Sequence, residues 1–498
     1  MALKSKVDKD LRRISQLEKA TAKVGRRNVN LGFGLVFLIG VWIYASFQSV
    51  GIEGGGILIV AAVIGGYMAM NIGANDVANN VGPAVGSKAI TLVGALFIAA
   101  IFEAAGAIIA GGEVVKTISK GIIDADMVAN RETFIWAMMS ALLAAAVWVN
   151  LATYVGAPVS TTHAVVGGVL GAGVAAAGIA AVNWPVMAKI AASWVISPVL
   201  GGIIAAGFLA FAKYFILYKE DKTTAAKKWV PVLVAILAST FSIYLVMKGL
   251  KRIWKPDITI ILIIGACVFA VAYGIVSPIV AKASKSLENR RKSVSDLFTI
   301  PLICAAALLS FAHGANDVAN AVGPLAAIVS AVSAGTVAAK VTLPIWVLIV
   351  GAIGISVGLA LYGPKVIEIV GEKITKLNRV RAFCIALSAA ITVIIASGLG
   401  LPVSSTHIAV GAVFGVGFLR EIITNREKKA SRALPAGAQV SGLSAESFDR
   451  EKNRLKKAQK RKLVRRNHLW TIVAAWVITV PAAALLSGLI FLSINALF

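Results

Sequence analysis

The sequence predicts an all-α polytopic membrane protein with about 12–13 transmembrane segments, arranged as an inverted-topology repeat with broken or half helices at the midplane. The first supporting observation is composition: 58% of the 498 residues are hydrophobic and 14% are charged. Soluble domains have about 45–50% apolar and about 25% charged residues. The composition therefore excludes a soluble enzyme, a disordered chain and a fibrous repeat. The other observations are many long apolar segments and two passages that each occur twice.

Apolar segments long enough for a bilayer, about 20 residues of helix each, follow one another along the chain. In order they are 31–50, 55–79, 89–111, 133–156, 158–179, 185–216, 230–247, 258–279, 297–323, 341–362, 380–400, 402–419 and 468–495. Segments 158–179 and 402–419 are rich in glycine and begin at a Pro-Val-Ser sequence. These two are the weakest candidates for complete spans.

Basic residues orient the predicted spans. With the N-terminus inside, the inner segments hold 39 Lys and Arg and the outer segments hold 8. Positive residues favour the cytoplasmic side, so we expect a multi-pass protein of the plasma (cytoplasmic or inner) membrane with a cytoplasmic N-terminus. The basic tails lack the interleaved aromatic residues that nucleic-acid binding uses. Anionic lipid headgroups are the expected partners of these tails, and nucleic acid is not.

Two passages recur with nearly constant spacing. NIGANDVANNVGPAVGSK at 71–88 matches AHGANDVANAVGPLAAIVS at 312–330, and APVSTTHAVVGGVLGAG at 157–173 matches LPVSSTHIAVGAVFGVG at 401–417. The first passage ends the second predicted span and its copy ends the ninth, so the copies run in opposite directions. Inverted repeats are typical of secondary transporters, whose substrate site lies at the midplane.

The repeat and the charge pattern divide the chain into seven parts. They are a basic cytoplasmic tail (1–30), an extra helix (31–50), repeat 1 (55–216), a helical hairpin with basic loops (217–296), repeat 2 (297–419), a basic cytoplasmic insertion (420–467) and the last helix of repeat 2 (468–498).

The first repeated motif places an acid in an apolar segment, where an ionised Asp costs about 2.5–3.5 kcal/mol. Gly and Pro on both sides predict a helix that unwinds and frees backbone carbonyls. Carboxylate, amide and carbonyl oxygens suit Na⁺ or another hard cation. Capping of a broken helix is the alternative role. The predicted sodium ligands are Asn75, Asp76, Asn79, Asn316, Asp317 and Asn320.

The second motif has the features of an anion site. Pro158 and Pro402 suit the first helical position, and hydroxyl side chains follow in a turn that also carries unpaired N–H groups and the positive end of the dipole. Hydrogen bonds between packed helices are the alternative use of these hydroxyls. The predicted substrate-binding residues are Asp76, Ser160, Thr161, Thr162, Asp317, Ser404, Ser405 and Thr406.

Four further polar residues lie in apolar segments, three of them histidines in or beside the motifs and the fourth, Glu103, in the predicted span 89–111. Glu103, His163 and His407 are possible site residues, although a single buried histidine more often has a structural role. His313 precedes the second Gly-Ala-Asn-Asp, but Ile72 stands at the equivalent position, which makes it the weaker candidate. No cysteine spacing indicates a zinc site or a disulfide. Because the repeats indicate a secondary transporter, we expect no catalytic residue, and no cofactor other than Na⁺, or H⁺, as coupling ion.

The paired GANDVAN and P-V-S-S/T-T-H motifs resemble the inorganic phosphate transporter (PiT) family. The resemblance implies a symporter, usually a homodimer, that imports inorganic phosphate with Na⁺ or H⁺ by alternating access. It places phosphate between Ser160–Thr162 and Ser404–Thr406, and sodium near the Asn-Asp motifs. The Gly-Ala-Asn-Asp spelling is similar to the sodium-coupled members. Many members have a Glu where this chain has Ala386, which bears on the coupling stoichiometry.

Other functions stay open at this point. The same architecture could carry phosphate with protons, or sulfate or another tetrahedral oxyanion. An intramembrane hydrolase would pair Ser160 or Ser404 with His163 or His407, but the duplication would then make two identical active sites that face opposite ways. An ion channel is a further alternative.

Overall fold

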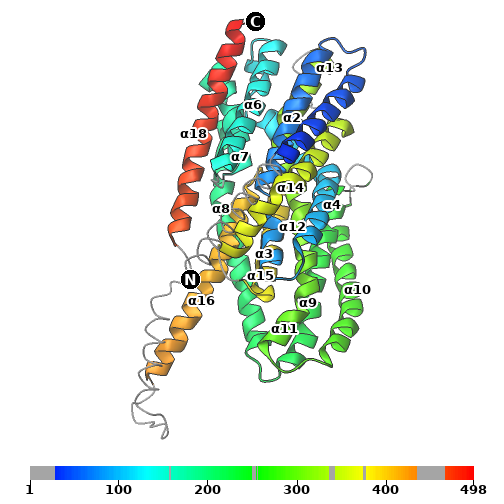
Figure 1. Cartoon of the computed structure of the whole chain (residues 1–498), viewed down its shortest axis with the longest axis vertical. Helices are drawn as coiled ribbons and strands as arrows, with labels where there is room; N and C mark the ends of the chain where they lie inside the picture. The colour runs from blue at the N-terminus through cyan, green and yellow to red at the C-terminus, as the bar shows by residue number, and fades with distance from the viewer. Residues whose placement is uncertain are drawn as a thin grey trace, which may run out of the picture.

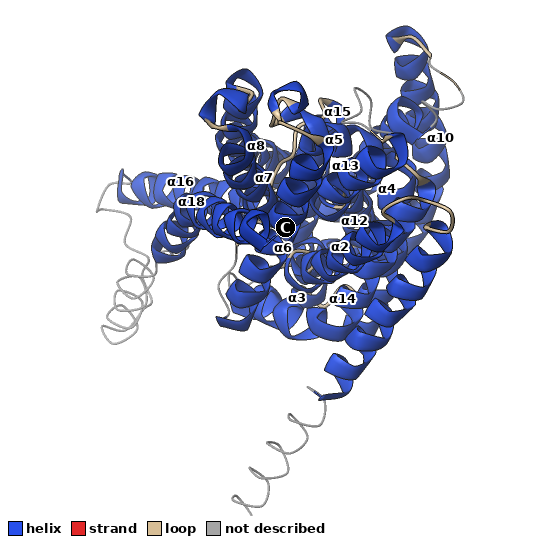
Figure 2. Cartoon of the chain, turned by 90° about the horizontal axis from the view of Figure 1, so that it is seen from above, coloured by secondary structure: helices blue, strands red, loops and turns tan. Residues whose placement is uncertain are grey.

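The computed structural model describes residues 28–155, 159–249, 254, 256–335, 343–373, 377–433 and 466–497. The described part of the chain is almost entirely helical and contains no strand, apart from one isolated bridge between Ile123 and Val182 (Figure 2). Twelve helices in these ranges are long and apolar enough to cross a membrane. The prediction of an all-α polytopic membrane protein is therefore confirmed. The predicted basic tail and most of the predicted insertion lie outside the described residues.

The long helices follow the apolar segments of the sequence. The first is Asn28–Gln48, and the others are α2 (Gly55–Asn75) with α3 (Ala78–Gly86), α4 (Leu92–Ala110), α6 (Arg131–Val155), α8 (Trp184–Ala212), α9 (Lys222–Tyr244), α10 (Ile258–Ser284), α12 (Thr299–Asp317) with α13 (Ala319–Ala334), α14 (Ile345–Lys373), α15 (Arg379–Gly398), α16 (Ser405–Ala433) and α18 (Arg466–Leu497). Three shorter elements bear on the site: α5 (Gly112–Lys116), the π-helical turn η1 (Thr117–Gly121) and α7 (Thr161–Ala177). A further short helix, α11, covers Arg291–Leu297.

Several helices of each half pack against a helix of the other half. In Figure 1, α2 lies beside α14 and α7 lies beside α18. The equivalent pairs are α12 with α4 and α16 with α8. In every pair one helix comes from each half of the chain. Such an exchange is what two related halves around an internal two-fold axis produce. Their opposite direction in the membrane stays a prediction.

Both copies of the first motif lie at helix breaks, and the breaks are short. α2 ends at Asn75 and α3 begins at Ala78, while only Val318 separates α12 from α13. The backbone at Asp76 and at Val318 stays in the right-handed helical region. The unwound segment that we expected at each motif is therefore a kink of one or two residues.

Prolines and glycines around the breaks act on the helices in different ways. Pro83 and Pro324 lie inside α3 and α13. Proline has no N–H group, so the carbonyl four residues earlier loses its helical donor. The glycines instead permit close packing: a Cβ atom on Gly73 would collide with the carbonyl oxygen of Ile355 in α14, and one on Gly314 would collide with that of Glu103 in α4. Small residues let helices in membranes approach closely.

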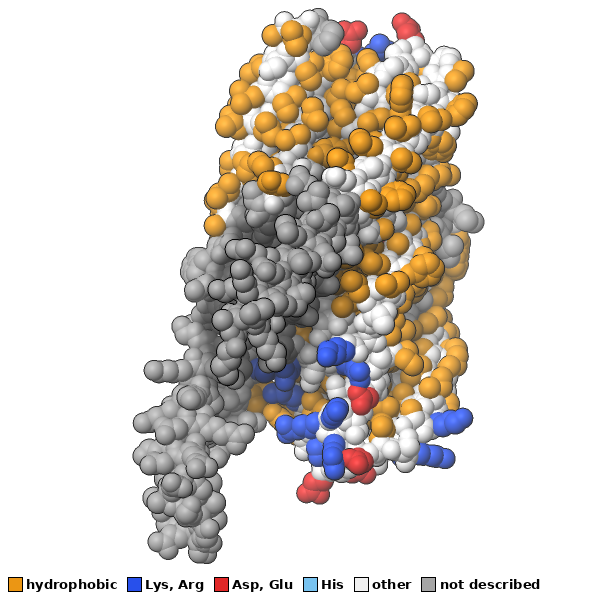
Figure 3. Space-filling view, in the orientation of Figure 1, with side chains coloured by type: hydrophobic (Ala, Val, Ile, Leu, Met, Phe, Trp, Pro, Cys, Tyr) orange, Lys and Arg blue, Asp and Glu red, His pale blue; other side chains and the backbone are white. Residues whose placement is uncertain are grey.

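The most buried helices stand at the centre of the bundle. α12, α13 and α15 are largely covered by other helices, whereas α10 and the helix Asn28–Gln48 turn most of their apolar side chains outward. Figure 3 shows hydrophobic side chains over most of the flank and Lys and Arg gathered at its lower end. The surface therefore has the pattern of a protein embedded in lipid.

Replacing a glycine at a helix contact should destabilise the fold. We expect Gly73→Ala to cost about 1–3 kcal/mol, because the added methyl group overpacks the α2–α14 contact. Gly56 is the matched control in the same helix, since a Cβ atom there would meet no atom within 4 Å. Gly56→Ala should be neutral or stabilise by up to about 1 kcal/mol. Thermal unfolding in detergent measures both, and equal midpoints would contradict the packing model.

Candidate functional site

The carboxylate of Asp76 joins the starts of two helices from opposite halves. Its oxygens accept hydrogen bonds from Thr161 Oγ1 at 2.7 Å and from Thr406 Oγ1 at 3.1 Å. Thr161 is the first residue of α7 and Thr406 the second residue of α16. All three side chains are buried. Hydroxyls that the sequence places 245 residues apart thus meet on one acid.

The asparagines of the first motif also cross between the halves. Asn79 Nδ2 donates to Thr406 Oγ1 at 2.8 Å. Its counterpart Asn320 donates to Thr161 Oγ1 at 3.2 Å and to Thr162 Oγ1 at 3.1 Å. Each motif therefore reaches the hydroxyl run of the other repeat. The structure brings the predicted sodium ligands and the predicted substrate ligands into one cluster.

A second set of hydrogen bonds recurs within each half. Asn75 donates to Thr153 at 3.0 Å, and Asn316 donates to Ser397 at 2.8 Å. These bonds point two predicted ligands toward α6 and α15. Thr153 and Ser397 are separated by 244 residues, the offset of the second motif. The repeat offset was a signal that could have identified both residues from the sequence.

α7 and α16, the helices that follow the two Pro-Val-Ser sequences, begin with matching caps. Ser160 Oγ accepts from the backbone N–H of His163 at 3.2 Å, and Ser404 Oγ accepts from that of His407 at 3.3 Å. The prediction that Pro402 begins a helix is wrong. α16 starts at Ser405 because Ser404 provides the cap, and the Pro402 carbonyl accepts from the Trp194 indole at 3.1 Å. Pro158 lies outside the described residues.

The histidines after the hydroxyl runs pack against aromatic rings. The centroids of the His163 and His407 rings lie 4.7 Å apart, and the His163 ring meets Trp194 edge-on at 3.8 Å. A Ser–His hydrolase needs a hydrogen bond from the serine to the imidazole. In the contacts described for Ser160 and Ser404, each oxygen instead accepts a backbone N–H.

A buried network of polar side chains, which our sequence reasoning undervalued, joins the two halves. His313 Nδ1 lies 2.7 Å from Glu103 Oε2, and His313 Nε2 lies 2.7 Å from Asp317 Oδ2. Asn80 donates to the other Glu103 oxygen at 2.7 Å. We had ranked His313 low because repeat 1 has Ile72 at that position. The missed signal was the pairing with Glu103, which likewise has no counterpart.

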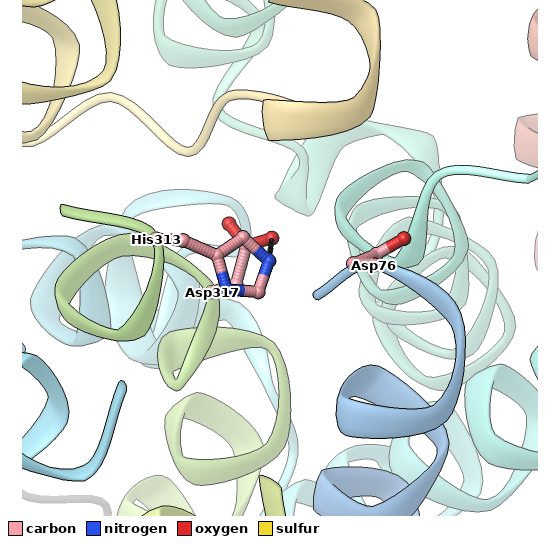
Figure 4. A group of neighbouring side chains, drawn as sticks. All are labelled: Asp76, His313 and Asp317. Carbon is pink, nitrogen blue, oxygen red and sulfur yellow. Dashed lines mark ion pairs between the residues drawn. The ribbon is translucent and has the colours of Figure 1, made fainter. Parts of the chain in front are cut away.

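The two carboxylates of the motifs approach each other at the centre of the site. Figure 4 shows His313 paired with Asp317, with Asp76 on the neighbouring α2 break. One ligand atom from each of these residues lies within 4.8 Å of the others. Ser405 adds a hydrogen bond to Asp317 at 3.1 Å.

Two oxygens of this cluster are buried without a hydrogen-bond donor: Asp317 Oδ1 and Asn320 Oδ1. An unsatisfied buried acceptor calls for an explanation, and a hard cation satisfies carboxylate and amide oxygens of this kind. The chemistry of these atoms therefore fits the sodium site that the sequence predicted. Ala386 is fully buried in α15.

Glu103 and His313 should be energetically coupled. We expect Glu103→Gln and His313→Gln to destabilise the protein singly, and their double mutant to reveal a coupling of about 0.5–3 kcal/mol. The free energies of unfolding of the wild type, the two single mutants and the double mutant, measured in one detergent, give this double-mutant cycle. Asp221 caps α9 and shares no described contact with Glu103, so Glu103→Gln combined with Asp221→Asn should be additive. If the effects of Glu103→Gln and His313→Gln on the free energy of unfolding were additive as well, the interaction between the two residues would contribute nothing to stability.

The family model, the related sequences and the solved structure that match this chain all carry names that refer to phosphate transport. Residues 72–487 match the family described as "Phosphate transporter family". A protein of Helicobacter pylori, provisionally named a phosphate permease, is 48% identical over 98% of this chain and 99% of its own length. One from Pyrococcus abyssi with the same provisional name is 37% identical over 87% of this chain and 97% of its own. A solved structure titled "The sodium-dependent phosphate transporter" matches with a TM-score of 0.76 and 35% identity, over 89% of this chain and all of the other.

Proposed function

The chain belongs to the phosphate transporter family, and on this basis we propose that it is a secondary active symporter that imports inorganic phosphate coupled to sodium, by alternating access between its two repeats. The observation that carries the proposal is the position of Asp76. Its carboxylate is held by hydroxyls from both halves, Thr161 and Thr406. An acid shared in this way can link the occupancy of the site to the relative position of the repeats.

Coupling follows from competition for the hydroxyl groups. In the structure Thr161 and Thr406 donate to the Asp76 carboxylate, the group that phosphate would have to replace. A sodium ion that binds the carboxylates attracts them away from the hydroxyls and offsets their negative charge. The freed hydroxyls and the positive ends of α7 and α16 can then receive the anion. Phosphate binds poorly without sodium because the carboxylates both repel it and occupy its donors.

Sodium is favoured as the coupling ion by two observations. The oxygens of Asp317 and Asn320 that lack donors are ligands that a hard cation prefers. The similar solved structure is titled a sodium-dependent phosphate transporter. Protons are the alternative coupling ion, since buried carboxylates can also accept them.

Phosphate is favoured over sulfate by the acids in the site. Hydrogen phosphate carries a proton that a carboxylate can accept, while sulfate offers none at neutral pH. Asp76, Asp317 and Glu103 are the candidate acceptors. None of the ligands proposed here is Lys or Arg, so the anion is held by neutral donors and can leave again.

The remaining expectations concern the setting of the protein. We propose a plasma-membrane (cytoplasmic or inner-membrane) location with a cytoplasmic N-terminus, which the basic side chains at one end of the molecule support. Homodimer formation and binding of anionic headgroups by the basic segments stay predictions.

Removing either central charge should abolish coupled transport. We expect Asp76→Asn and Asp317→Asn to reduce sodium-driven phosphate uptake at least about 100-fold, the scale of losing a buried charge interaction of about 3 kcal/mol. Uptake into proteoliposomes under an imposed sodium gradient measures this. Glu132→Gln, at the start of α6 and away from the site, is the control and should keep wild-type uptake. Full uptake in both Asn variants, with normal incorporation, would refute the proposal.

Uptake under a sodium or a proton gradient identifies the coupling ion, and competition with sulfate identifies the anion. We expect a sodium gradient to drive uptake of labelled phosphate, a proton gradient alone to drive little, and excess cold sulfate to leave the rate unchanged. Proton-driven uptake would reassign the acids to a proton relay. A complete block by sulfate would show that the hydroxyl donors set the selectivity and would make sulfate a substrate.

A further inference from the structure

A cavity that is separate from the candidate functional site lies beside the turn that connects α15 to α16. Its volume is about 360 Å³, and three lysines line it: Lys116, Lys120 and Lys189. Lys116 ends α5, Lys120 lies on η1, and Lys189 is in the first part of α8. The consecutive elements α5 and η1 and the more distant α8 thus bring three lysines to one cavity. None of the three belongs to the site described above.

The α15–α16 turn, which lines one side of this cavity, also contacts the binding site. Leu399, Gly400 and Leu401 line the cavity, and the hydroxyl run of α16 follows directly after Pro402 and Val403 in the sequence. The Leu401 carbonyl accepts from Asn316 Nδ2 at 3.3 Å, and the Val403 N–H donates to Asn316 Oδ1 at 3.4 Å. Only this short turn separates the cavity from a predicted sodium ligand.

The lysine-bearing elements η1 and α8 also contact the α15–α16 turn directly. Thr117, next to Lys116, donates its hydroxyl to the Gly400 carbonyl at 2.7 Å. α8 also contacts both places, since it provides Lys189 to the cavity and Trp194 to the Pro402 carbonyl. The backbone segments that carry the lysines are therefore held against the turn.

The charge balance of the cavity stays positive. Glu113 lies 3.4 Å from Lys116, and the Lys116 side chain is still 66% exposed. Partial burial lowers the pKa of the Lys120 ammonium, while the Asp126 carboxylate raises it. Two acids thus offset three lysines only in part. Lys120 is partly buried, whereas Lys116 and Lys189 are exposed. Several like charges gathered at one hollow attract anions to it even when they are hydrated.

We propose that Lys116, Lys120 and Lys189 form an outer vestibule that collects the phosphate anion before it passes the α15–α16 turn into the binding site. The proposal rests on the proposed function and on the orientation with the α4–α6 connection outside. The lysines act on capture, so they set the apparent affinity at low phosphate. They do not take part in the sodium-coupled step. Because the binding site itself is built from neutral donors, the positive charge that attracts the anion is placed here instead.

Charge removal in intact cells tests the vestibule. The variant is Lys116→Gln with Lys120→Gln and Lys189→Gln, expressed in bacteria that lack their own phosphate carriers. We expect the KM for phosphate to rise about three- to tenfold, with Vmax per membrane-inserted protein within about twofold, because electrostatic capture changes encounter and not turnover. Higher ionic strength at fixed sodium should reduce the difference between variant and wild type.

Two triple variants are the controls. Replacing the same three lysines by arginine keeps the charge and should keep the wild-type KM. Replacing Lys222, Lys227 and Lys228 of α9 by glutamine removes the same charge elsewhere and should also leave the KM unchanged. An unchanged KM in the vestibule variant, or a loss of Vmax that arginine does not restore, would overturn the proposal.

Lipid headgroups also carry phosphate groups, so the experiment must distinguish free phosphate from lipid phosphate as the ligand of the three lysines. Purified wild type and vestibule variant are compared in vesicles of phosphatidylcholine alone and with anionic lipid added. A KM difference in both lipids supports capture of free phosphate, while a difference that needs anionic lipid assigns the lysines to headgroups and overturns the vestibule. If the wild type carries sulfate in place of phosphate, the proposed substrate is wrong, and the same comparison with sulfate tests the vestibule alone.

Discussion

The carboxylate of Asp76 is the point at which the two halves of the molecule are held together chemically. A charged group in this position is expensive unless hydrogen bonds satisfy it, and Thr161 and Thr406 supply them from opposite repeats. The hydroxyls can reach it only because α7 and α16 begin where they do, each with a serine cap. The close contact at Gly73, three residues before Asp76 and so about one turn away along α2, lets α14 pack tightly enough to bury the whole arrangement.

The two carboxylates are related by the repeat but have different surroundings. Asp317 is paired with His313, which is paired in turn with Glu103, whereas the described partners of Asp76 are hydroxyls. A positive or proton-sharing partner keeps Asp317 in place more firmly than neutral donors keep Asp76. We therefore regard Asp76 as the more exchangeable of the two acids. A symmetric fold thus provides an asymmetric site, in which one half is anchored and the other can respond to ligands.

Most of the architecture could be predicted from the sequence, because hydropathy and repeated motifs report directly on spans and on shared ligands. Asp76, Thr161 and Thr406 were identified by their recurrence in apolar segments. His313 was undervalued for the same reason, since a comparison of repeats ignores residues that occur once. Thr153 and Ser397 were missed because they lie outside the motifs. Gly73 and Gly314 were read as sites of unwinding, but helix contacts across the bundle, which no local pattern reports, explain them better.

The exchange of helices between halves has a consequence for how the protein is made. α7 enters the membrane early, yet its packing partner α18 is the last helix of the chain. Until α18 is synthesised, one face of α7 contacts lipid or another protein. α2 and α8 also wait for partners in the second half, α14 and α16. The N-terminal half therefore cannot complete its own core, and the bundle closes only after α18 has been made.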